Sequence, residues 1–61
     1  MDPIFDMKKM ERLAERDRYV KFVFNDLSAR NPTVPAEEIW EIVFNSTVLD
    51  DSVMIDSYKS S

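Results

Sequence analysis

The sequence contains no glycine among its 61 residues, and this absence limits the folds open to the chain. Glycine supplies the positive φ angles of tight β-hairpin turns, of many helix C-caps and of phosphate-binding loops. A sheet built from strands joined by two-residue turns is therefore disfavoured, and P-loops and dinucleotide-binding fingerprints are excluded. We expect an all-α fold.

Apolar periodicity and proline positions predict a long first helix over residues 3–30. Asp2 can cap this helix, and Pro3 suits its first position, where the missing N–H costs nothing. The helix is predicted to stop at Asn31-Pro32, because a proline disfavours helical geometry in the residue before it. The segment Tyr19–Phe24 is rich in aromatic and β-branched residues and also fits a strand. Its strongly helical flanks favour helix.

A second helix is predicted over residues 35–46 and a short third helix over residues 50–58, capped by Asp50 or Asp51. The short, stiff connection after the first helix predicts that the first two helices lie side by side or cross closely. The expected fold is a helical hairpin or three-helix module, with a single domain over residues 1–58 and a frayed tail at 59–61.

The apolar surface exceeds what so few helices can bury within one chain. A domain of this size buries only about 60% of the surface that its unfolded chain exposes. Cysteine and histidine are absent, so a disulfide or an ordinary zinc site cannot stabilise it. We therefore expect an oligomer, such as a homodimer, or a partner-bound chain. The predicted interface consists of the large aromatic residues Tyr19, Phe22, Phe24, Trp40 and Phe44. The alternative is that these side chains form the core of a compact monomer.

The formal net charge is −4, and it is unevenly distributed. Residues 1–30 hold seven basic and six acidic side chains, whereas residues 31–61 hold one basic and six acidic ones, a net charge of −5. The candidate acidic face consists of Glu37, Glu38, Glu41, Asp50 and Asp51. Complementarity of charge predicts a basic partner surface, although ordinary solubilising charge is the simpler interpretation.

The residue types argue against catalysis. Without cysteine and histidine there is no thiol nucleophile, no imidazole base and no usual transition-metal ligand set. The carboxylates match no calcium-loop spacing. We expect no enzyme, no cofactor and no metal site. Because no secretory signal and no long apolar span are evident, we expect a cytoplasmic protein that does not enter a membrane.

Two spacings resemble known families. The spacing Tyr19…Phe22…Asn31-Pro32…Glu38-Ile39…Ile42…Tyr58 resembles that of an HMG-box DNA-binding domain over about two-thirds of the chain. It lacks the third-helix tryptophan and the strong basic charge of that family. The run from Tyr19 and Phe22 to Asn31-Pro32-Thr33-Val34-Pro35 and Glu38-Ile39 is similar to the toxin-wrapping part of some plasmid antitoxins, with a different proline spacing.

These observations favour a non-enzymatic, acidic protein-binding regulator or inhibitor, antitoxin-like or phage-inhibitor-like, that acts through an exposed aromatic helical face. Two alternatives remain open. One is a three-helix DNA-binding protein that uses the basic first helix, on which Lys8, Arg12 and Arg16 recur every four residues. The other is a structural homo-oligomer subunit.

Overall fold

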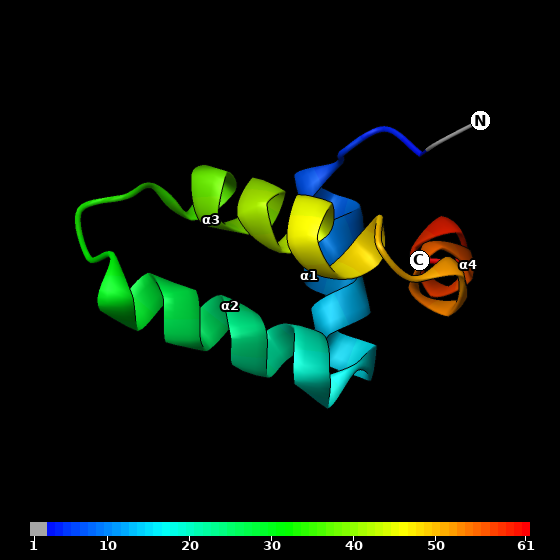
Figure 1. The fold of residues 1–61 in the computed structure, drawn as a ribbon, viewed down its shortest axis with the longest axis horizontal. Coiled ribbons are helices and arrows are strands. Elements are labelled where there is room, and N and C mark those ends of the chain that lie inside the picture. The colour runs from blue at the N-terminus through cyan, green and yellow to red at the C-terminus, as the bar shows by residue number, and fades with distance from the viewer. Residues whose placement is uncertain (1–2) are drawn as a thin grey trace.

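The structure is a computed structural model that describes residues 3–61. An extended arm precedes a set of packed helices, and the predicted all-α fold is confirmed (Figure 1). In chain order the elements are α1 (Met7–Arg16), α2 (Arg18–Arg30), α3 (Ala36–Val43), the π-helical turn η1 (Phe44–Val48) and α4 (Ser52–Lys59).

The prediction of one long first helix is wrong, because Asp17 divides it into α1 and α2. Asp17 has extended backbone angles, φ −121° and ψ 111°. Its carboxylate accepts hydrogen bonds from the amides of Tyr19 and Val20 at 2.9 and 3.3 Å. Its own N–H donates to the carbonyl of Leu13 at 2.8 Å. A short aspartate side chain competes with helical hydrogen bonds in this way, so one residue ends α1 and caps α2.

Aspartate caps two further helices by the same geometry. The carboxylate of Asp6 accepts from the first-turn amides of α1, and that of Asp51 does so for α4. The third helix is therefore confirmed, with Asp51 as its cap. The first helix does not begin at Pro3 as predicted: it starts at Met7, and Pro3 lies in the extended arm. The cap predicted at Asp2 lies outside the described residues.

Replacement of Asp17 by alanine should lower the free energy of unfolding by about 1 kcal/mol, within the range of about 0.5–2 kcal/mol known for lost N-caps. The reason is that two first-turn amides of α2 lose their acceptor. Urea denaturation followed by circular dichroism measures the change. Asp50→Ala is the matched control, since Asp50 is an exposed aspartate in the turn before the α4 cap. Equal losses in the two variants would contradict the capping role of Asp17.

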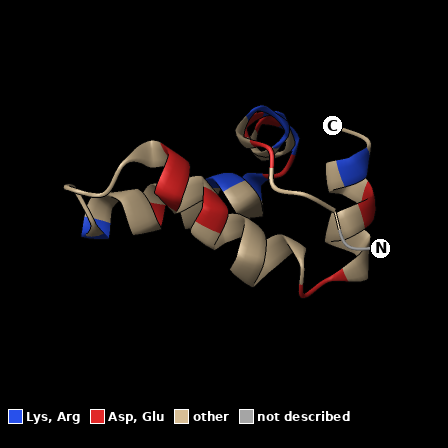
Figure 2. Cartoon of the chain, turned by 90° about the horizontal axis from the view of Figure 1, so that it is seen from above, with Lys and Arg blue, Asp and Glu red and all other residues tan. Residues whose placement is uncertain are grey.

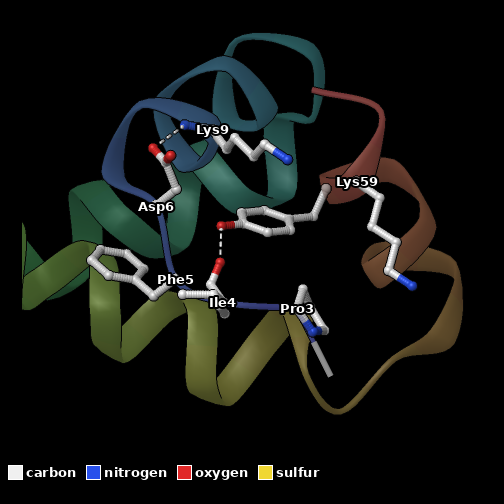
Figure 3. A pocket seen from close by; sticks show the side chains of 7 residues that line it. Pro3, Ile4, Phe5, Asp6, Lys9 and Lys59 are labelled. Carbon is white, nitrogen blue, oxygen red and sulfur yellow. Dashed lines mark hydrogen bonds between the residues drawn. The ribbon is translucent and has the colours of Figure 1, made fainter. Parts of the chain in front are cut away.

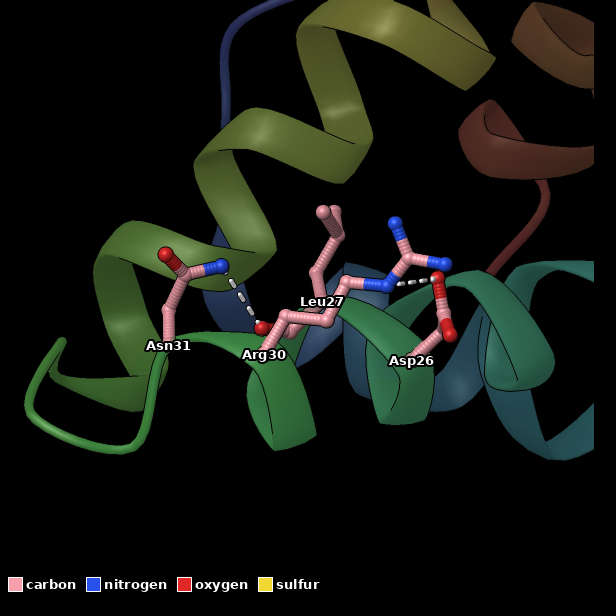
Figure 4. Close-up of polar contacts among 4 residues, drawn as sticks. All are labelled: Asp26, Leu27, Arg30 and Asn31. Carbon is pink, nitrogen blue, oxygen red and sulfur yellow. Dashed lines mark hydrogen bonds and ion pairs between the residues drawn. The ribbon is translucent and has the colours of Figure 1, made fainter.

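Helices α2 and α3 form an antiparallel hairpin, and α1 crosses one side of it (Figure 1). The predicted close packing of these two segments is thus confirmed, and Tyr19–Phe24 is helical. The rings of Phe24 and Trp40 stack between the two helices with centroids 3.7 Å apart. At the end of α2 the side chain of Asn31 donates to the carbonyl of Leu27 at 2.9 Å, which closes the last turn (Figure 4).

The second predicted helix widens into a π-helical turn before its predicted end at residue 46. α3 stops at Val43, and in η1 the N–H of Leu49 donates to the carbonyl of Phe44 at 3.0 Å, five residues back. This hydrogen-bond pattern defines a π-turn. It places both Phe44 and Val48 on the inner side, where they are buried.

One cluster of buried side chains joins all the helical elements. It consists of Met10, Leu13, Ala14, Val20, Ile39, Trp40, Val43, Phe44, Val48 and Tyr58. α4 closes the cluster by packing against α1 and η1. In the segment predicted as a frayed tail, the Ser61 carbonyl and hydroxyl accept hydrogen bonds from Arg12 and Arg16.

Candidate functional site

Two of the predicted interface aromatics project into solvent from α2. Tyr19 is 60% exposed and Phe22 is 66% exposed. They are three residues apart and therefore neighbours on one side of the helix. The inner side of α2 carries Val20, Phe24 and Leu27, which pack into or against the core. Tyr19 and Phe22, here called the α2 patch, are left outside.

Trp40 and Phe44 belong to the buried core and Phe24 is a partly buried side chain packed against it, so these three do not form the exposed face that the sequence predicts. Trp40 is 8% exposed and stacks on Phe24. Phe44 is 3% exposed. Its ring lies between those of Phe5 and Tyr58, with centroid distances of 5.6 and 5.1 Å. The break at Asp17 allows α1 to cross the hairpin beside Phe24 and Trp40, whereas the N-terminal arm and α4 supply the rings that cover Phe44.

Charged side chains of both signs flank the α2 patch, since Arg18 and Asp26 each lie one helical turn from Phe22. α2 carries Arg18, Lys21 and Arg30 against the single acidic residue Asp26, which gives it a net charge of +2. Asp26 and Arg30 form an ion pair, with 3.3 Å between Arg30 Nε and Asp26 Oδ2 (Figure 4). An exposed ion pair of this kind adds little stability. The helix that carries the aromatic patch is therefore basic, in contrast to the acidic second half of the chain.

The predicted acidic residues fall into two groups. Glu37, Glu38 and Glu41 are exposed on α3. Of these, Glu38 and Glu41 line a shallow groove of about 330 Å³ together with Ile42 and Asn45. Asp50 and Asp51 lie before α4, and the uncharged segment 44–49 separates them from α3 (Figure 2). The two groups do not form one continuous face, and Asp51 is occupied as a helix cap.

A second groove, which the sequence did not indicate, lies between the N-terminal arm and α4 (Figure 3). It has a volume of about 530 Å³. The Tyr58 hydroxyl donates a 2.7 Å hydrogen bond to the carbonyl of Ile4 and so ties the arm to α4. Lys9 Nζ lies 5.7 Å from the centroid of the Tyr58 ring, within cation–π range. The groove is lined by Pro3, Ile4, Phe5, Asp6, Lys9, Tyr58 and Lys59. A sequence signal was missing because the contact joins residues at opposite ends of the chain.

Burial raises the pKa of the Tyr58 phenol above its ordinary value of 10; a hydrogen bond with the Asp6 backbone offsets part of this rise, and the charge of the Asp6 carboxylate makes a smaller raising contribution. In the unfolded chain this phenol ionises near pH 10, whereas in the folded chain it keeps its proton to higher pH. The unfolded state then binds fewer protons, so the free energy of unfolding falls as pH rises above about 10.

We expect Tyr58→Phe to weaken this alkaline loss of stability, because phenylalanine has no proton to release. Urea denaturation of the wild type and the variant, carried out on both sides of pH 10, measures the difference in slope. Tyr19→Phe is the control, since Tyr58 remains present in it and the decline should persist. An equally steep decline in Tyr58→Phe would show that Tyr58 does not cause it.

The basic residues of α1 are partly engaged within the fold. Arg16 donates to the carbonyl of Ser57 at 2.9 Å and to the Ser61 hydroxyl at 3.2 Å. Arg12 donates to the carbonyl of Ser61 at 3.4 Å. Cations near a helix C-terminus interact favourably with its dipole. These two arginines thus contact the C-terminal end of α4.

Within residues 3–61, no group of three or more acidic, cysteine or histidine side chains is placed to hold a metal ion. None of the helices in this range has the length and apolar character needed to cross a membrane.

No protein-family model matches this chain, and comparison with curated proteins and with solved structures finds no similar one.

Proposed function

We propose that this protein is a non-enzymatic regulator or inhibitor that acts in the cytoplasm by binding another protein through the α2 patch. The observation that carries the proposal is the exposure of Tyr19 and Phe22, at 60% and 66%, side by side on α2. Large aromatics contribute most of the energy of protein interfaces, and a monomer gains nothing by leaving two of them together in solvent.

The charge of α2 supports one kind of partner over another. The net charge of +2 on α2 favours an acidic surface with an apolar centre, because complementary potentials guide association and suppress wrong partners. Binding by a helix face that inserts apolar anchors is a common mode of protein recognition. Inhibitors of this type act by occupying a surface of the target and need no chemistry of their own.

Photo-crosslinking in the host that encodes the chain tests the proposal. A photoreactive phenylalanine analogue replaces Phe22 in the full chain, and the same analogue at the exposed position Val53 on α4 serves as the matched control. We expect an adduct with one defined protein from position 22 and none from position 53. The adduct at position 22 should disappear when Tyr19 is changed to serine. Identical adduct patterns at both positions, or none at position 22, would refute binding through the α2 patch.

A further inference from the structure

The side of α1 that faces α4 carries basic residues, whereas glutamates lie on its side toward α2 and α3. Lys9, Arg12 and Arg16 are three and four residues apart and therefore share one side of the helix. Both arginines contact the C-terminal end of α4. Glu11 and Glu15 instead line a separate groove of about 260 Å³ between α1 and the α2–α3 hairpin. The packing of α1 thus gathers positive charge beside α4, in a chain whose net charge is −4.

The groove between the N-terminal arm and α4 adjoins these basic residues. Lys9 lines it from α1 and Lys59 lines it from α4 (Figure 3). The one acidic lining residue is Asp6, and its carboxylate accepts hydrogen bonds from first-turn amides of α1 at 2.9 and 3.2 Å. The lining residues therefore carry a net charge of +1. Within residues 3–61 the one ion pair joins Asp26 and Arg30, so neither lysine is paired with a carboxylate of this range.

The arm gives the same groove an apolar wall. Ile4 is 87% exposed, and Pro3 and Phe5 line the groove on either side of it in the sequence. The arm is held in place because the Tyr58 hydroxyl donates to the carbonyl of Ile4 and the Phe5 ring packs on Phe44. The groove volume of about 530 Å³ lies within the range of about 300–1,000 Å³ that is usual for ligand sites. A few side chains of a short segment fit there, whereas a folded domain does not.

We propose that this groove binds a short acidic segment of a partner protein, with its carboxylates at Lys9 and Lys59 and an apolar side chain against Ile4. Complementary potentials favour a ligand of negative charge, and burial of the exposed aliphatic side chain favours a ligand that is also partly apolar. A nucleic acid fits less well, because DNA-binding domains carry a clear basic excess and a phosphate backbone offers Ile4 no apolar contact. The inference goes beyond the proposed function, since the arm, α1 and α4 form this groove and the α2 patch has no part in it.

Fluorescence anisotropy of a labelled synthetic peptide, titrated with the full chain, tests the proposal. The probe is acetyl-Glu-Leu-Glu-Glu-Leu-Glu amide, and the same peptide with lysine in place of every glutamate is the charge control. We expect the acidic peptide to bind, with an affinity that falls as salt rises because exposed charges are screened. We expect no binding of the basic peptide. Absence of binding by the acidic peptide at low ionic strength, or equal binding of the two peptides, overturns the proposal.

Single substitutions locate the peptide. Lys9→Ala and Lys59→Ala should each weaken binding about two- to fivefold, the effect of losing one exposed charge pair. Lys8→Ala is the matched control, because Lys8 is an exposed lysine of α1 outside the groove lining, and it should bind nearly like the wild type. Ile4→Ser should weaken binding about fivefold without a change of charge, whereas Val53→Ser, at a side chain 71% exposed on α4, should not. Equal losses in Lys8→Ala and Lys9→Ala would mean that only net charge matters and would overturn the site.

Two further measurements separate this site from the alternatives, and circular dichroism verifies that all variants are folded. A labelled DNA duplex that binds more tightly than the acidic peptide, and that loses affinity in Lys9→Ala, would assign the groove to phosphates and overturn the peptide ligand. Tyr19→Ser, which should abolish the crosslink at position 22, should leave the affinity for the peptide unchanged. Loss of peptide binding in Tyr19→Ser would place the peptide on the α2 patch and overturn the groove. The two proposals therefore fail in different experiments.

Discussion

Replacement of Trp40 by alanine is expected to lower the free energy of unfolding by about 3–5 kcal/mol, a large share of the stability of a domain this small. Trp40 is 8% exposed and its ring stacks on Phe24 at 3.7 Å. Its removal leaves a cavity between α2 and α3 on the side covered by α1. Urea denaturation followed by far-UV circular dichroism measures the loss, since the variant has no tryptophan fluorescence.

Ile42→Ala is the control for this prediction. Ile42 lies two positions after Trp40 on the same helix and is 46% exposed. Its truncation should change the free energy of unfolding by less than about 1 kcal/mol, as for most surface positions. Losses of similar size at both positions would show that Trp40 is not part of the core. Trp40 would then be a surface residue, as the sequence predicts.

Replacement of Phe44 by alanine is expected to cost a similar amount, about 3–5 kcal/mol, with its strongest local effect at the two ends of the chain. The Phe44 ring lies between Phe5 of the N-terminal arm and Tyr58 of α4. These two elements also share the hydrogen bond from Tyr58 to Ile4. Loss of the central ring therefore removes a contact from both elements at once.

Hydrogen exchange of the backbone amides measures this local effect. Under native conditions the amides of α4 should exchange faster in Phe44→Ala, and their increase should exceed that in α2, because local opening follows the loss of buried contacts. Val53→Ala, which truncates an exposed side chain on α4 itself, should leave the exchange of α4 nearly unchanged. A uniform increase over all helices would mean that Phe44 supports the whole core and holds no particular element.

The helical segments were largely predictable because their signals are local. Pro32 and Pro35 mark the connection between α2 and α3. Asp51, one of the two residues predicted to cap the last helix, caps α4. The break at Asp17 was missed although its signal is also local. Aspartate favours a cap over a helix interior, but the helical spacing of apolar residues continues on both sides of Asp17 and predicts an unbroken helix.

The candidate site was predictable in part. Tyr19 and Phe22 were among the aromatics expected to be exposed, and they are. The apolar pattern predicts the same exposure for Trp40, Phe44 and Phe24, because two long helices alone cannot cover so many apolar side chains. With an additional bend in the chain, a further helix becomes available to cover them. The groove at Tyr58 had no sequence signal, since it joins residue 4 to residue 58.

By itself the sequence determined the helical class, the approximate helix positions after residue 30 and the charge of each segment. These properties depend on backbone preferences and ionisable groups that act within a few residues. The tertiary structure alone decided which aromatics are covered and which remain in solvent. Burial depends on contacts between residues far apart in the chain. The change of direction at Asp17 lets α1 cross the hairpin beside Trp40, and the two ends of the chain cover Phe44, while Tyr19 and Phe22 stay in solvent.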